Sequence, residues 1–137
     1  MSNRIVVIDD EVLILGFLKD VLTNEDYDVE IFSSANKAIK YIDENEIDLV
    51  ITDVQMNEMT GDDILNYAKK NQPKTGVIII TGFGNVSHAV RSLQKGAFDY
   101  ITKPFKAKEI IYRVRRFFDE GGSESNTLAS KELNLDK

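Results

Sequence analysis

Five short apolar runs alternate along the chain with segments of helical period, and this alternation restricts the fold more than any other feature. The runs cover residues 4–8, 29–32, 48–52, 77–81 and 98–102. The first, third and fourth runs are almost wholly apolar, as expected for central parallel strands that are covered on both faces. The second and fifth runs are weaker and fit the edges of a sheet.

Between the runs, apolar residues recur every three or four positions, which places them on one face of a helix. The first of these stripes contains Ile14, Leu18, Val21 and Leu22. Residues 60–63 resemble a helix-starting capping box, and Asn85 and Gly96 are the candidate start and end of the fourth helix. The sequence therefore predicts an α/β fold, a doubly wound (βα)5 unit with right-handed crossovers.

Length and composition limit the classes of function. The chain has 137 residues, no cysteine and a single histidine, so disulfides and zinc–thiolate sites are excluded, and a bound metal would need oxygen ligands, as Mg²⁺ does. A net charge of −6 argues against binding to nucleic acid. No apolar stretch is long enough to span a membrane and the start lacks a signal-peptide pattern, so we expect a cytoplasmic protein.

The composition changes after Phe118. Residues 119–126 are polar and rich in glycine and serine, which is typical of a flexible segment. We therefore expect one domain over residues 1–119, followed by a flexible tail or linker over residues 120–137.

Polar residues follow or close four of the five runs. Asp9 and Asp10 come after the first, Asp53 after the third, Thr81 closes the fourth and Lys103 follows the fifth. If the strands are parallel and ordered 2-1-3-4-5, strands one and three are neighbours, and these side chains share the sheet edge where α/β proteins bind ligands. Such a set can bind a divalent cation and stabilise a phosphoryl group.

The same residues have simpler interpretations. Asp9 and Asp10 could simply be caps of the first helix. Thr81 could be no more than the start of a turn, and Lys103 before Pro104 no more than the end of a strand. Three clustered carboxylates, however, raise one another's pKa unless a cation offsets them. Mg²⁺ at this edge would keep Asp53 ionised and nucleophilic.

Four segments, in this order, resemble the receiver domain of bacterial response regulators. They are Ile8–Glu11, Leu49–Met56, Ile80–Gly82 and Lys95–Phe105. The resemblance covers about residues 1–119 and implies a flavodoxin-like (βα)5 fold with a parallel sheet of order 2-1-3-4-5. The sequence around Gly82 and Phe98 resembles that of receivers of transcriptional activators that carry an ATPase output domain.

The resemblance implies a phosphorylation-controlled switch in a two-component phosphorelay rather than a metabolic enzyme. Asp53 would accept a phosphoryl group from the phosphohistidine of a histidine kinase or phosphotransfer protein. The side chains of Asp10 and Asp53 would bind Mg²⁺, Asp9 would contribute mainly through water, and Gln55 would contribute its backbone carbonyl.

Three further residues receive roles from the resemblance. Thr81 would hydrogen-bond the phosphoryl oxygens, Lys103 would pair with their charge, and Tyr100 would turn inward when Thr81 moves. The fourth helix, fifth strand and fifth helix would offer a face for a homodimer. No direct contact of this chain with nucleic acid or membrane is expected.

Two positions depart from the usual family pattern. Asn57 stands where the family often has proline, so the loop after Asp53 is expected to be more mobile. Phe83, two residues beyond Thr81, is bulky and apolar, and we expect it to restrict attack by water and prolong the phosphorylated state. An equally weighted alternative makes Phe83 a plain surface aromatic or a partner contact.

The remaining candidates have structural interpretations. Met56 and Met59 are expected to pack in a loop, and His88 is expected to be a solvated surface residue without a catalytic role. Three arginines of the fifth helix form either a solvated face or part of a dimer contact. They are Arg113, Arg115 and Arg116.

Three alternative functions remain open from the sequence. A phosphatase or phosphotransferase of the haloacid-dehalogenase type also uses an aspartyl nucleophile and Mg²⁺, but usually has a second acid where Gln55 stands. A phosphorylation-independent interaction module normally lacks part of the site that this chain retains. A flavin-binding protein would need a hydroxyl- and glycine-rich first loop, which here is acidic.

Overall fold

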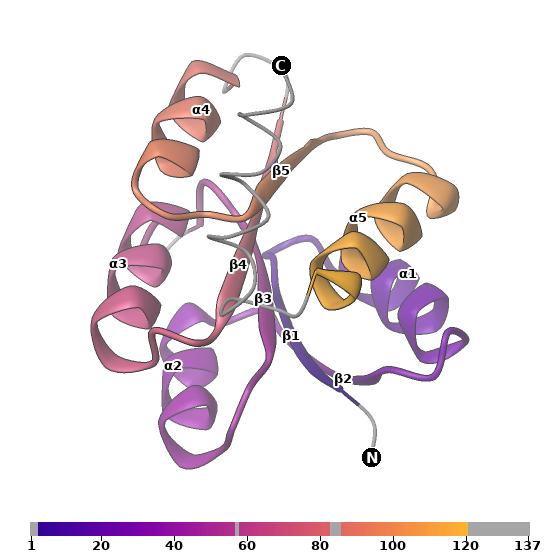
Figure 1. Cartoon of the computed structure of the whole chain (residues 1–137), viewed down its shortest axis with the longest axis horizontal. Coiled ribbons are helices and arrows are strands. Elements are labelled where there is room, and N and C mark those ends of the chain that lie inside the picture. The colour runs from indigo at the N-terminus through magenta and orange to yellow at the C-terminus, as the bar shows by residue number, and fades with distance from the viewer. Residues whose placement is uncertain (1–2, 57, 83–85, 121–137) are drawn as a thin grey trace.

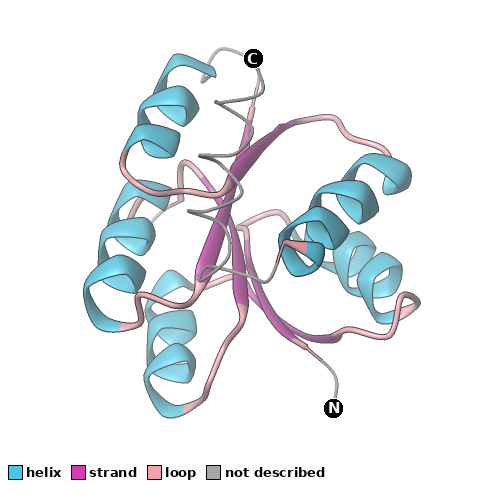
Figure 2. Cartoon of the chain, in the orientation of Figure 1, coloured by secondary structure: helices cyan, strands magenta, loops and turns pink. Residues whose placement is uncertain are grey.

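The computed structural model describes residues 3–56, 58–82 and 86–120. Five strands and five helices alternate along this part of the chain (Figures 1 and 2). In chain order they are β1 (Arg4–Ile8), α1 (Val12–Thr23), β2 (Asp28–Phe32), α2 (Ala35–Glu44), β3 (Leu49–Asp53), α3 (Gly61–Asn71), β4 (Gly76–Thr81), α4 (Val86–Gln94), β5 (Asp99–Thr102) and α5 (Ala107–Asp119).

All strand pairs are parallel, and the strand order is β2-β1-β3-β4-β5. This confirms the predicted fold class, including the two edge strands that the weaker apolar runs indicated. Strand β3 extends one residue further than the apolar run, so that Asp53 is its last residue and pairs with Ile80 of β4.

Helices cover both faces of the sheet. In Figure 1, α1 and α5 lie on one side, and α2, α3 and α4 lie on the other. Every residue of β3 and β4 is buried, because each central strand contacts both helical layers. Phe117 of α5 anchors the first layer and Ile64 of α3 the second, and both are buried in the core.

Local sequence signals fix the start of α3 and the end of α4. The Thr60 side chain accepts from the Asp63 N–H, and the Asp63 carboxylate accepts from the Thr60 N–H at 2.9 Å, so the predicted capping box at the start of α3 is confirmed. Gly96, with φ of 116°, follows the end of α4 as expected, because this left-handed conformation favours glycine. The predicted cap Asn85 lies outside the described residues.

The structure also tests the expectations for the two loop methionines, for His88 and for a membrane-spanning helix. Met56 and Met59 pack against the buried cluster under α2 and α3, as predicted. The expectation that His88 is solvated was wrong, because its side chain is 26% exposed and its Nε2 lies 2.6 Å from Asp62 Oδ2, while its lack of a catalytic role stays a prediction. Of the expected tail over residues 120–137, Glu120 is described, and residues 121–137 lie outside the described residues. None of the described helices combines the length and apolarity needed to cross a membrane.

The arginines of α5 form ion pairs within the chain, and the side chain of Arg115 is also 61% exposed. Arg113 Nη1 lies 2.7 Å from both oxygens of Asp99, which is on β5. Arg115 Nη2 lies 2.6 Å from Glu25 Oε1, beyond the end of α1. These pairs link α5 to the sheet edge and to its neighbouring helix.

Candidate functional site

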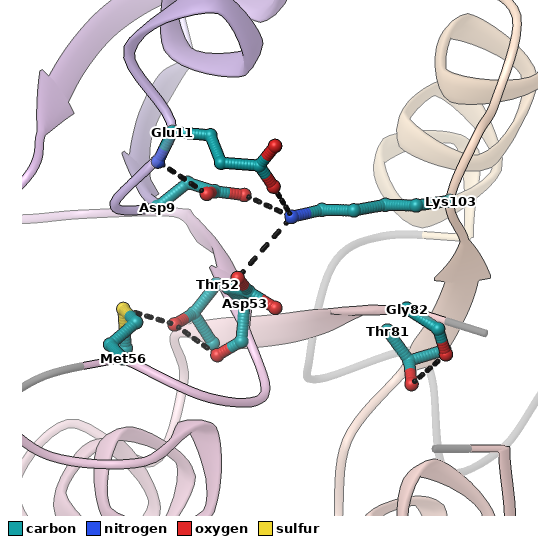
Figure 3. Close-up of polar contacts among 8 residues, drawn as sticks. All are labelled: Asp9, Glu11, Thr52, Asp53, Met56, Thr81, Gly82 and Lys103. Carbon is teal, nitrogen blue, oxygen red and sulfur yellow. Dashed lines mark hydrogen bonds and ion pairs between the residues drawn. The ribbon is translucent and has the colours of Figure 1, made fainter. Parts of the chain in front are cut away.

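The C-terminal ends of four strands bring polar side chains to one edge of the sheet. Asp9 follows β1, Asp53 ends β3, Thr81 ends β4 and Lys103 lies just beyond β5 (Figure 3). The strands are parallel, and β1 and β3 are the neighbours at which the strand order reverses, so the edge is the usual ligand-binding position of this fold class.

Three carboxylates converge at this edge. Oxygen atoms of Asp9, Asp10 and Asp53 all lie within 4.8 Å of one another. Asp9 is fully buried, Asp53 is 8% exposed and Asp10 is exposed, so the cluster has a covered floor and an open side. This confirms that the predicted acid pair and Asp53 lie together.

The buried carboxylate of Asp9 has two different partners. Its Oδ1 accepts from the Glu11 N–H at 2.9 Å, and its Oδ2 has the Lys103 Nζ 3.1 Å away as its charge partner. Lys103 also contacts Glu11 and Asp53, so this one ammonium offsets only part of the negative charge at the edge. The oxygen-only donor set fits a hard divalent cation such as Mg²⁺.

Burial makes the charged forms of two of these acids unfavourable. Desolvation raises the pKa of Asp9 above its ordinary value, and the hydrogen bond from the Glu11 N–H opposes the rise only in part. Desolvation also raises the pKa of Asp53, and Lys103 opposes that rise. A divalent cation would remove this penalty for both carboxylates.

Lys103 supplies the only ammonium shown in contact with this cluster in the described part of the chain. Its side chain is 17% exposed, and Nζ lies 2.5 Å from Glu11 Oε2, 3.1 Å from Asp9 Oδ2 and 3.3 Å from Asp53 Oδ2. Partial burial alone would lower the pKa of Lys103, but the surrounding carboxylates outweigh it and raise the pKa. Lys103 therefore stays protonated.

Backbone contacts of the Lys103 segment tie it to β4. The Lys103 N–H donates to the Thr81 carbonyl at 2.8 Å, and the Lys103–Pro104 peptide bond is cis. Figure 3 shows the Lys103 side chain reaching across the sheet edge, with Nζ 3.3 Å from Asp53 Oδ2.

Thr81 is buried beside the site but does not face the acids in this conformation. Its hydroxyl donates to the Gly82 carbonyl at 3.2 Å, and Figure 3 shows it apart from the Lys103 contacts. Tyr100 pairs with Ile79 in the sheet and is partly buried against the cluster under α2–α4. The Gln55 side chain is exposed, while Asn57 and Phe83 lie outside the described residues.

Sequence reasoning assigned no role to two residues that shape the site. Glu11 makes the shortest contact to Lys103, and its only sequence signal was its place directly after the acid pair. Gly61 lies against the end of β3, since a Cβ there would be 2.7 Å from the Asp53 carbonyl oxygen. The Gly61 N–H also donates to the Val54 carbonyl at 2.7 Å, which closes the loop after β3.

Comparison with known proteins places this geometry in a family. The sequence profile described as "Response regulator receiver domain" matches residues 5–115. The regulatory protein VanRc of Enterococcus gallinarum is 36% identical over 115 residues, which are 84% of this chain and 49% of that protein. The DNA-binding transcriptional regulator NtrC of a Bradyrhizobium species is 34% identical over 119 residues, which are 87% of this chain and 25% of that protein. The chain thus spans half or less of the length of these relatives.

Solved structures give the same result. A response regulator receiver domain protein from Clostridium thermocellum is 34% identical with a TM-score of 0.75, covering 98% of this chain and 99% of that chain. The beryllofluoride-activated NtrC4 receiver domain dimer is 32% identical with a TM-score of 0.81, covering 85% of this chain and 97% of that chain. NtrX- and NtrC-type regulators are among the relatives, which confirms the predicted resemblance to receivers of ATPase-type activators. The chain belongs to the family of response regulator receiver domains.

Proposed function

We propose that this chain is a phosphorylation-controlled signalling switch in which Asp53 accepts a phosphoryl group. The donor is a phosphohistidine of a sensor histidine kinase or phosphotransfer protein in a two-component phosphorelay. One observation carries the proposal: the Asp53 carboxylate ends a central strand between an acid pair and the Lys103 ammonium, which is 3.3 Å away. The phosphoacceptor domain comprises residues 1–119, and residues 120–137 form a tail or linker.

Mg²⁺ is the cofactor that the donor set fits. The side chains of Asp10 and Asp53 would hold it directly, Asp9 mainly through water, and Gln55 through its backbone carbonyl. The convergence of three carboxylates, whose oxygens lie within 4.8 Å of one another, supports a cation in this position. When bound, Mg²⁺ supplies positive charge that offsets the carboxylates and the phosphoryl oxygens.

The transfer step follows from these positions. A carboxylate oxygen of Asp53 attacks phosphorus, the P–N bond of the phosphohistidine breaks, and its electron pair returns to the imidazole nitrogen. The transition state is loose, so the contribution of the chain is positioning and charge stabilisation. Lys103 remains an ammonium and stabilises the transferring oxygens from its side of the site.

The new phosphoryl group gives the switch its driving force. It adds negative charge and acceptor oxygens at Asp53, which attract Lys103 and the Thr81 hydroxyl. Thr81 must then give up its bond to the Gly82 carbonyl, and Tyr100 turns inward into the space beside β4. This local change shifts the α4–β5–α5 face between two states. The role is regulatory, with self-assisted phosphotransfer and dephosphorylation only.

The surface next to the site fits a protein phosphodonor. Val12 and Leu13 at the start of α1 are 72% and 88% exposed, and they directly follow Glu11 of the Lys103 contact. Phe17 is 39% exposed and packs on Phe105 with ring centroids 6.1 Å apart. A phosphohistidine-bearing partner docked on this apolar patch would bring its imidazole to Asp53.

A homodimer through the α4–β5–α5 face is the second partner that we propose. Val86 and Val90 of α4 are each 40% exposed, and Tyr112 of α5 is 65% exposed. The NtrC4 receiver is a dimer when activated by beryllofluoride, which supports dimerisation, while the choice of this face rests on the exposed apolar side chains. The net charge of −6 gives no reason to assign nucleic-acid or membrane binding to this chain, and we propose a cytoplasmic location.

The test uses acetyl phosphate and beryllofluoride with and without Mg²⁺. Intact-mass spectrometry should show a metal-dependent phosphoryl adduct on the parent and on Asp43→Asn, an exposed control on α2, but none on Asp53→Asn. Size-exclusion chromatography with beryllofluoride tests the dimer. An unmodified parent after prolonged treatment would overturn the proposal, and turnover of a generic phosphate ester would favour the phosphatase alternative.

A further inference from the structure

Glu11 forms an ion pair with Lys103 in the structure, although no role in the switch has been assigned to Glu11. The Glu11 Oε2 lies 2.5 Å from Lys103 Nζ, closer than the oxygens of Asp9 at 3.1 Å and Asp53 at 3.3 Å. These residues are 92 positions apart, so the contact joins the start of α1 to the segment after β5. Glu11 precedes α1 as its N-cap, yet its side chain makes no capping hydrogen bond.

An ammonium has three donor hydrogens, and three carboxylates already surround Lys103 in this structure. A phosphoryl group on Asp53 adds further acceptor oxygens that compete for the same donors. Asp9 belongs to the acid cluster that fits a cation, whereas no oxygen of Glu11 is among the clustered atoms. Glu11 is therefore the carboxylate at Lys103 that lies outside the proposed cation site, and its contact competes directly with a phosphoryl group for the ammonium.

We propose that Glu11 is a positioning residue that holds Lys103 in the resting state and opposes its transfer to the phosphoryl group. This inference rests on the proposed function of Asp53. Two effects have the same direction. Glu11 competes for the ammonium, and its negative charge repels an incoming phosphoryl anion. Removing the charge of Glu11 should therefore favour the phosphorylated state.

The size of the effect follows from exposure. The Glu11 side chain is 58% exposed while Lys103 is 17% exposed, so solvent and salt weaken the pair. We expect Glu11→Gln to raise the affinity for beryllofluoride by about twofold to fivefold at low salt. The gain should shrink as salt is added, which a purely structural role of Glu11 would not produce. Glu11→Asp, with a shorter reach and the same charge, should lie between the parent and Glu11→Gln.

The experiment is a titration of each variant with beryllofluoride in saturating Mg²⁺, followed by NMR at the backbone amides of Thr81 and Gly82. Glu44→Gln is the matched control, because it removes the same charge from an exposed position at the C-terminal end of α2. A separate Mg²⁺ titration without beryllofluoride shows whether Glu11 contributes to cation binding.

The outcomes separate the inference from the proposed function. Tighter beryllofluoride binding by Glu11→Gln than by Glu44→Gln, with equal Mg²⁺ affinity, supports the inference. Unchanged or weaker beryllofluoride binding would overturn it, and so would a loss of Mg²⁺ affinity specific to Glu11→Gln, because Glu11 would then act as a metal ligand. A parent that binds no beryllofluoride would overturn the proposed function and the inference together.

Discussion

Asp62 Oδ2 and His88 Nε2 lie 2.6 Å apart, and this contact joins the first turn of α3 to the first turn of α4. The other oxygen of Asp62 accepts from the Ser92 hydroxyl at 3.0 Å, one helical turn further along α4. Lys95 Nζ, beyond the end of that helix, lies 4.0 Å from Asp62. A single carboxylate thus fastens one side of α4, the helix that leads from the Thr81 segment to the proposed dimer face.

Loss of this contact should loosen α4. We expect Asp62→Ala to destabilise the packing of α4 by roughly 1–2 kcal/mol, because hydrogen bonds to a charged group are lost. Hydrogen exchange at the amides of α4 should become faster, while the amides of α1 keep their rates. Asp43→Ala on α2 is the control, and equal exchange in both variants would show that Asp62 does not restrain the helix.

The same carboxylate predicts a dependence on acid pH. Partial burial would raise the pKa of Asp62, but the hydrogen bonds from His88 and Ser92 outweigh it and lower the pKa. An acid with a lowered folded-state pKa contributes stability above its unfolded value and loses it as pH falls through the folded value. Asp62→Asn should therefore be less stable than the parent at neutral pH in urea unfolding. The difference should begin to shrink near pH 4 and disappear only below the lowered folded-state pKa of Asp62.

For Asp53 we expect the opposite dependence of folding stability on pH. Desolvation raises the pKa of Asp53, so its ionisation costs folding stability as pH rises through about 4 and beyond. In magnesium-free buffer we expect Asp53→Asn to be more stable than the parent at neutral pH, and the gain to vanish at low pH. Thermal unfolding across pH measures this. Added Mg²⁺ should raise the melting temperature of the parent more than that of the variant, and equal shifts would argue against cation binding by Asp53.

A side chain at Gly61 should disturb the end of β3 by a steric clash. A Cβ at this position would lie 2.7 Å from the Asp53 carbonyl oxygen and 3.1 Å from the Val54 Cα, so backbone must move. Gly61→Ala should destabilise the domain by about 1–3 kcal/mol and slow phosphoryl uptake from acetyl phosphate. Gly16→Ala is the matched control, since a Cβ in that helix meets nothing within 4 Å. Similar behaviour of both variants would contradict this prediction.

Phe83 predicts the lifetime of the phosphorylated state. Its bulk, two residues beyond Thr81, is expected to restrict the approach of water to the phosphoryl group. Phe83→Ala should therefore hydrolyse its acyl phosphate several-fold faster, as followed by the decay of the intact-mass adduct. Tyr112→Ala, which removes an exposed aromatic from α5, should leave the lifetime unchanged. A Phe83 variant with the parent's lifetime would favour the alternative of a surface aromatic.

The sequence predicted the sheet and the place of the site because both follow from local pattern. Apolar runs such as residues 77–81 must be buried on both faces, and parallel strands direct their C-terminal residues to one edge. Asp9, Asp53 and Lys103 were therefore expected together, and the structure places them together. The capping box at Thr60 was equally predictable from the sequence, since its two hydrogen bonds join residues only three positions apart.

Tertiary structure alone decided the contacts that tune this arrangement. The partners Glu11 and Lys103 are 92 positions apart, and Asp62 and His88 are 26 positions apart. Neither pair has a sequence period, because each depends on how α1 and α4 pack against the sheet, and so His88 was wrongly expected in solvent. Local hydrophobic pattern and strand direction determined which chemistry the chain carries. The side-chain pairing across separate elements decided how tightly the Lys103 ammonium and helix α4 are held.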